Sequence, residues 1–170
     1  MKAIKVTALV LGLCGSAAGL ALAAGGAPGH SHGGHNEETA FGIAGDPKKA
    51  SRPVTIFMSE SDGKMSFIPS IVEVRQGEQI KFVLRNNGEI DHELVLATFA
   101  MNMAHAEEMK KNPDMEHDDP NAKRVAPKKS SEIVWKFTKA GEFDFSCLIP
   151  GHREAGMTGK VIVKASTAAK

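Results

Sequence analysis

Apolar residues fall at every second position in many short runs between residues 53 and 166. Ile80, Phe82 and Leu84 show the pattern, because residues spaced in this way point to one face of a β-strand. The runs, which turn-forming Gly, Pro and Asn residues separate, are 54–58, 65–68, 71–74, 79–85, 93–96, 131–137, 142–147 and 159–164. Seven or eight short strands of this kind predict an all-β protein with a Greek-key β-sandwich fold.

One segment departs from the alternating pattern. Residues 99–111 are good helix formers and end before Asn112-Pro113, so a short helix is predicted there. An acidic loop follows, over residues 114–121. We therefore expect a helix and an acidic loop, residues 99–121, inserted between two strands of a domain that spans residues 53–166.

The beginning of the chain has the pattern of a secretory signal peptide. Lys2 and Lys5 precede an apolar run, residues 6–23, which glycines interrupt and which ends in small residues. A transmembrane anchor is the less favoured alternative, because the run barely reaches the ~20 residues that a membrane span needs. We expect residues 1–24 to be removed on export, most simply to the periplasm, and the mature chain to contain no membrane span.

The next segment, residues 25–52, is rich in Gly, Ala, His and charged residues and shows no apolar periodicity. Such a composition predicts a flexible arm ahead of the domain. The arm carries three histidines, His30, His32 and His35.

Composition and charge narrow the class of protein. A chain of 170 residues is long enough for one domain of ordinary size. With 21 basic and 20 acidic residues the formal net charge is +1, so no strong field attracts nucleic acid. Removal of the signal peptide would take Cys14 with it and leave Cys147 as a lone thiol in a compartment where thiols are oxidised or paired. An unpaired thiol there needs a reason: either it is a buried apolar cysteine or it binds a metal.

Cys147, His152 and Met157 follow one another at intervals of five residues. A thiolate, an imidazole and a thioether together favour copper, which must be held as both Cu(I) and Cu(II). Cys147 would end a strand, and Pro150-Gly151 would turn the chain so that His152 returns to the metal. Zinc is the competing metal, but structural zinc rarely uses a thioether and usually has more than one cysteine.

A second imidazole would complete a site of two His and one Cys with a weak axial Met, the arrangement of electron-transfer copper centres. His92 is the expected fourth ligand, because it follows a turn and opens a strand of the predicted sandwich. The other histidines lie in the arm, the helix or the acidic loop: His30, His32, His35, His105 and His117.

The order of an Asn-rich turn, His92, a long interval, and then Cys147, His152 and Met157 resembles the cupredoxins, the plastocyanin and azurin superfamily. The resemblance covers residues 53–165 and looks closest to the periplasmic copper-tolerance cupredoxins of the CopI type. It implies a cupredoxin-like sandwich with one type 1 copper per chain. The ligand intervals differ by a residue or two from those of the best-known electron carriers, so loop length does not determine colour or potential.

Further His and Met residues lie outside this motif. The arm histidines either collect copper transiently or have no defined coordination. Met101, His105 and Met109 recur at every fourth residue and form one stripe on the predicted helix. We interpret the stripe as packing against the sandwich in preference to a second, weak copper site.

The expected function is copper tolerance by a periplasmic copper-binding protein. The alternative is a soluble electron carrier that docks on a periplasmic redox or copper-handling partner through an exposed apolar patch, formed by Leu148, Ile149 and Pro150. An enzyme is not expected, because the chain has one such domain and lacks the paired His-x-His motifs of a trinuclear copper centre.

Overall fold

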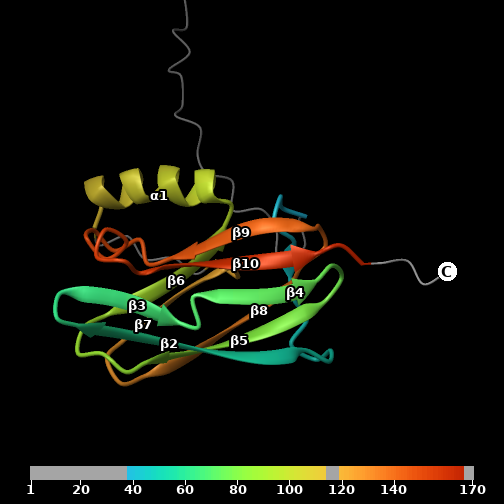
Figure 1. The fold of residues 1–170 in the computed structure, drawn as a ribbon, viewed down its shortest axis with the longest axis horizontal. Helices are drawn as coiled ribbons and strands as arrows, with labels where there is room; N and C mark the ends of the chain where they lie inside the picture. The colour runs from blue at the N-terminus through green and yellow to red at the C-terminus, as the bar shows by residue number, and fades with distance from the viewer. Residues whose placement is uncertain (1–37, 114–118, 167–170) are drawn as a thin grey trace, which may run out of the picture. The chain divides into compact units, whose positions relative to one another are not determined.

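The computed structural model describes residues 38–113 and 119–166 of the chain. These residues contain ten strands and one helix. Two five-stranded sheets form the two layers of a β-sandwich (Figure 1). The all-β sandwich with a short helical insert that the sequence predicts is confirmed.

Each of the two sheets contains both parallel and antiparallel pairs of strands. The strand order in the first sheet is β1 (Ile43–Ala44), β8 (Ser130–Lys136), β5 (Gln79–Asn86), β2 (Arg52–Ser61) and β3 (Lys64–Ile68). The order in the second sheet is β4 (Ile71–Arg75), β10 (Thr158–Lys164), β9 (Gly141–Ser146), β6 (His92–Ala97) and β7 (Ala122–Val125). Strands β2 and β5 are parallel, as are β4 and β10, and the other neighbours are antiparallel.

The core lies between the two sheets, and the alternating residues of the sequence build it. Ile80, Phe82 and Leu84 of β5 are each at most 1% exposed. The rings of Phe67 in β3 and Phe145 in β9 meet edge to face across the two layers, with centroids 5.2 Å apart. Burial of this apolar surface is the main favourable contribution to folding.

The described part of the predicted arm is folded onto the sandwich. Phe41 is 2% exposed, and its ring stacks on Trp135 at 5.1 Å between centroids. The Trp135 indole N–H donates to the Phe41 carbonyl (2.9 Å), and β1 pairs with β8. Strands β1 and β7 are additional to those expected, and β1 lies ahead of residue 53 in the chain. The signal peptide and His30, His32 and His35 lie outside the described residues.

Helix α1 (Phe99–Lys111) has the bounds that the sequence predicts. The Thr98 hydroxyl caps it by accepting a hydrogen bond from the Met101 backbone amide (3.2 Å). The helix contacts β9 and β6 on the outer side of the second sheet (Figure 1). A second apolar cluster joins the helix to that sheet: Val95, Ala106, Met109, Ala122 and Leu148. In residues 38–113 and 119–166, no helix has the length and hydropathy needed to cross a membrane.

The Met101, His105 and Met109 stripe does not share one environment. Met109 is 0% exposed and packs in the second cluster, whereas Met101 is 49% exposed. Packing therefore accounts for Met109, as the sequence interpretation favours.

We expect Met109→Ala to lower the free energy of unfolding by about 3 kcal/mol, because it leaves a cavity under the helix. The matched variant Met101→Ala removes the same atoms from an exposed site and should change it by less than about 0.5 kcal/mol. Urea denaturation followed by Trp135 fluorescence measures both. Equal losses in the two variants would contradict the packing role of Met109.

Candidate metal centre

Strand pairing in the second sheet brings the candidate ligands together. Strands β6 and β9 are antiparallel neighbours, with Val95 opposite Ser146. The start of β6 and the end of β9 therefore lie at the same rim of the sandwich. His92 is the first residue of β6, and Cys147 directly follows the last residue of β9.

The loop between β9 and β10 is closed by its own backbone. The Cys147 amide donates to the Met157 carbonyl (3.1 Å), and the Met157 amide donates to the His152 carbonyl (3.1 Å). Gly151 and Gly156 adopt φ angles of +88° and +107°, which favour glycine. One short loop thus returns both His152 and Met157 to the neighbourhood of Cys147.

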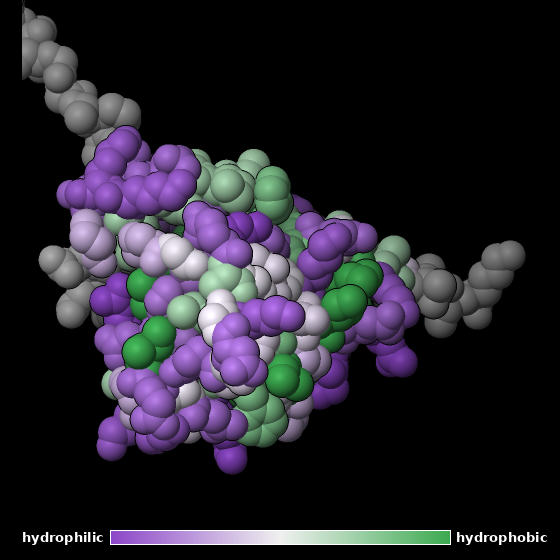
Figure 2. Space-filling model, turned by 60° about the vertical axis from the view of Figure 1, so that its left-hand side comes forward, coloured by the Kyte–Doolittle hydropathy of each residue, from purple (hydrophilic) through white to green (hydrophobic). Residues whose placement is uncertain are grey.

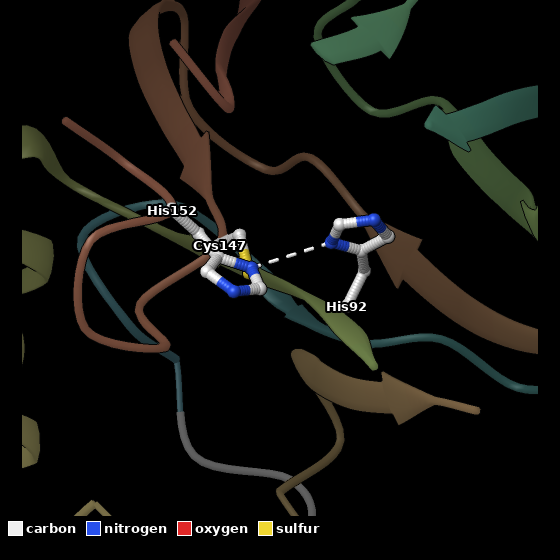
Figure 3. Close-up of side chains that lie close together, drawn as sticks. All are labelled: His92, Cys147 and His152. Carbon is white, nitrogen blue, oxygen red and sulfur yellow. Dashed lines mark hydrogen bonds between the residues drawn. The ribbon is translucent and has the colours of Figure 1, made fainter. Parts of the chain in front are cut away.

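Three of the four predicted ligands converge in space. One ligand atom each from His92, Cys147 and His152 lies within 4.8 Å of the other two (Figure 3). The two Nδ1 atoms are 3.3 Å apart, and Cys147 Sγ is 3.3 Å from His152 Nδ1. His92, Cys147 and Met157 are fully buried, and His152 is 9% exposed. His152 is therefore the member of the set nearest to solvent.

Burial determines the protonation of the sulfur and of one ring. It raises the pKa of the Cys147 thiol to about 12, and the nearby Glu93 charge adds to the rise although the Glu93 amide opposes it. Burial also lowers the pKa of His152, and His92 lowers it further against the opposing charge of Glu60. At neutral pH His152 is a neutral imidazole with a free lone pair, and a metal must displace the Cys147 proton.

Glu93, the residue after His92, links β6 to the ligand loop through its backbone amide and through its side-chain carboxylate. Its amide donates to Cys147 Sγ (3.4 Å), and its carboxylate accepts from the Leu148 amide (3.0 Å). The residue is 3% exposed, and Arg124 approaches its other oxygen at 3.9 Å. These contacts hold the thiol and the residue that follows it in place.

Glu60, at the end of β2, lies behind His92. Its Oε2 is 2.7 Å from His92 Nε2, so the ring donates that proton to the carboxylate. Partial burial raises the pKa of Glu60, but hydrogen bonds from the Glu89 amide and from His92 lower it below its usual value. With Nε2 protonated, His92 Nδ1 carries the free lone pair and faces Cys147 and His152.

The chemistry of this set fits a bound copper ion. Two imidazole nitrogens and a sulfur converge on one buried point, where each can offer a lone pair to a metal. A metal bonded at about 2.1 Å to two nitrogens with near-tetrahedral angles separates them by roughly 3.4 Å, close to the spacing of the two Nδ1 atoms. Thiolate with imidazole selects copper or zinc, and a methionine in the same loop favours copper.

Comparison with known proteins agrees with this donor set. A family model described as copper binding proteins of the plastocyanin/azurin family matches residues 54–164. This chain belongs to that family. The cupredoxin resemblance seen in the sequence is therefore confirmed, and copper is the metal that the family binds.

Individual relatives of this cupredoxin extend over most of its length. The copper-resistant cuproprotein CopI of Rubrivivax gelatinosus is 52% identical over 143 residues, which cover 80% of this chain and 85% of the relative. A protein of the same name from Pseudomonas aeruginosa is 35% identical over 154 residues, covering 74% and 83%. The structure of auracyanin B matches with a TM-score of 0.60 and 18% identity over 73% of this chain and 96% of auracyanin B, which shows a shared fold.

The structure of this cupredoxin does not expose all three residues of the expected apolar docking patch. Leu148 is 2% exposed, because it packs under α1 with Met109 and Val95. Ile149 is partly buried, and Pro150 is exposed. The side of the molecule turned forward in Figure 2 shows small, separate hydrophobic areas among hydrophilic ones. The inserted helix thus removes one of the three residues predicted to form the patch.

A buried polar network anchors the ligand loop of the cupredoxin to β9 and α1. Arg153, next to His152, donates to Asp144 Oδ2 (3.0 Å), which also accepts from the Ser146 hydroxyl (2.6 Å) and the Asn102 amide (2.7 Å). The Arg153 guanidinium also lies 5.3 Å from the Phe99 ring centroid. One carboxylate therefore holds groups from the loop, the strand and the helix.

The sequence interpretation missed these supporting residues. Glu93 had a signal, since a charged residue within the apolar run 93–96 needs a buried partner. Asp144 had a similar signal, because it lies between the alternating Phe143 and Phe145. Glu60 had none, since nothing local connects it to a histidine 32 residues away.

We expect Asp144→Ala to lower the free energy of unfolding of the copper-free protein by about 3 kcal/mol, because it removes the carboxylate that pairs with the partly buried Arg153 and accepts from the buried Asn102. Glu142→Ala is the matched control, since this residue of the same strand pairs with Lys160 at the surface. The control should cost less than about 1 kcal/mol. Similar losses in the two variants, measured by thermal denaturation, would show that the network adds nothing.

Proposed function

We propose that this cupredoxin binds one type 1 copper through His92 Nδ1, Cys147 Sγ and His152 Nδ1, with Met157 as a weak axial ligand. The observation that carries the proposal is the convergence of two Nδ1 atoms and one sulfur at a buried point. This donor set would allow a bound copper ion to exist as both Cu(II) and Cu(I). The protein contributes a fixed donor set, exclusion of water, and loss of the Cys147 proton on binding.

We further propose that copper binding serves copper tolerance in the periplasm. The support is the name copper-resistant cuproprotein carried by relatives with 52% and 35% identity. The signal-peptide pattern of residues 1–24 supports export. The additional His and Met residues of the arm and the insert suit a protein that meets surplus copper.

The metal-binding residues of the chain also bear on whether the protein is an enzyme. Among residues 38–113 and 119–166, one group of potential metal ligands that includes His, Cys, Asp or Glu is found, and it is the mononuclear set. Multinuclear copper oxidation needs further clustered histidines, and the chain has one His-x-His sequence, at His30-Ser31-His32. We propose that the protein binds copper without catalysing a reaction on a second substrate.

The ligand assignment predicts an optical signal. Copper(II) added to the purified protein should produce an intense sulfur-to-copper charge-transfer absorption, and Cys147→Ser should abolish it. Met157→Leu is the informative comparison, because a weak axial ligand affects the position of the band more than its existence. Retention of the intense band in Cys147→Ser would overturn the ligand set.

The tolerance role predicts a selective growth defect. A strain that carries Cys147→Ser in place of the natural gene should grow normally without added copper and fail at copper concentrations that the parent strain survives. An unchanged copper limit together with impaired respiratory growth would instead support the electron carrier. The buried position of Leu148 already weakens that alternative, since it reduces the apolar docking surface.

A further inference from the structure

The Glu60 carboxylate is in direct contact with the side chain of a proposed ligand, His92. We propose that Glu60 positions His92 for copper and favours Cu(II) over Cu(I) at the site. This inference rests on the proposed function, since it concerns the oxidation state that the same site prefers.

The first step is the orientation of the ring. His92 is fully buried, and its Nε2 donates to Glu60 Oε2 at 2.7 Å. A carboxylate only accepts hydrogen bonds, so the contact selects the tautomer with Nε2 protonated and Nδ1 free. Because Nδ1 is the atom that faces Cys147 and His152, the same contact aims the ring at the metal position. Hydrogen bonds of this kind to the second ring nitrogen orient metal-bound histidines.

The second step is how the fold holds Glu60 in place. Glu60 belongs to the first sheet and His92 to the second, so their contact joins the two layers at the rim. The loop between β5 and β6 closes over the carboxylate, because the Glu89 amide donates to Glu60 Oε1 and the Asn87 amide donates to the Met58 carbonyl (2.9 Å).

Gly88 makes this arrangement possible. A β-carbon at position 88 would overlap both oxygens of the Glu60 carboxylate. Any side chain there would therefore push the carboxylate away from His92 without touching the ligand itself.

The third step is charge. Cu(II) carries one more positive charge than Cu(I), so a nearby negative charge stabilises Cu(II) more. The neighbouring Glu89 pairs with Lys128 at 2.5 Å, which compensates its charge. Glu60 has no Lys or Arg within ion-pair distance among the described residues, and its side chain is 21% exposed. Its charge therefore acts on the imidazole and, through it, on the metal.

The test measures the reduction potential of the copper-loaded protein by spectroelectrochemistry. Glu60→Gln keeps the size of the side chain and removes its charge. It leaves one side-chain oxygen, which can accept from either the Glu89 amide or His92 Nε2 but does not replace both acceptors. Loss of such a contact changes metal affinity by about 10-fold or more. We expect the ratio of Cu(II) to Cu(I) dissociation constants to rise at least about tenfold, which raises the potential by about 59 mV for one electron.

Two further variants separate the contact from general charge and from folding. Asp62→Asn removes an exposed negative charge two residues away on the same hairpin and should shift the potential much less than Glu60→Gln. Gly88→Ala leaves Glu60 in the chain but displaces its carboxylate, so it should shift the potential in the same direction as Glu60→Gln.

A copper-free readout tests the positioning role. Long-range proton–nitrogen NMR spectra of the wild-type protein should show His92 protonated at Nε2 and bare at Nδ1, and Glu60→Ala should populate the other tautomer. An unchanged tautomer in Glu60→Ala would overturn the positioning role.

The remaining outcomes bear on different claims. Potential shifts in Glu60→Gln and Gly88→Ala no larger than that of Asp62→Asn would overturn the inference about oxidation state. Such a result, in a protein whose Cys147→Ser variant is colourless, leaves the ligand set intact. The proposed copper ligand set itself would instead be overturned if the intense absorption band survived in Cys147→Ser.

Discussion

The candidate site depends on the antiparallel pairing of β6 with β9. Because Val95, Leu96 and Ala97 lie opposite Ser146, Phe145 and Asp144, the first residue of β6 and the residue after β9 meet at one rim. His92 and Cys147, 55 positions apart in the chain, are brought together by that register alone. A one-residue slip of either strand would turn its ligand to the opposite face of the sheet, so the apolar core that maintains the register also maintains the site.

Around this pair, the chain places acidic groups with distinct partners. Glu93 fastens the residue after the thiol and donates its own amide to the sulfur, while Glu60 accepts from the far side of His92. Asp144, in β9, accepts a hydrogen bond from Arg153, the residue next to His152. Together they stiffen a loop whose backbone already closes on itself, so the donor atoms need little rearrangement when a metal binds.

The inserted helix changes the surface next to the ligand loop. Since α1 packs on β9 and β6, its Met109 covers Leu148, and the loop presents Pro150 with a partly buried Ile149. His152 remains the ligand nearest to solvent, although it is only 9% exposed. A covered loop of this kind agrees better with holding copper than with docking a large redox partner through an apolar surface.

The local spacing of residues was sufficient to predict much of the secondary structure and of the candidate site of this protein. The alternation of Ile80, Phe82 and Leu84, the helix of residues 99–111, and the Cys147, His152 and Met157 loop were all readable in the sequence, because each depends on neighbours a few residues away. The tertiary structure alone decided that Phe41 extends the core and that Leu148 is covered. It also decided that Glu60 contacts His92, since these contacts join segments far apart in the chain whose proximity depends on sheet register and helix docking.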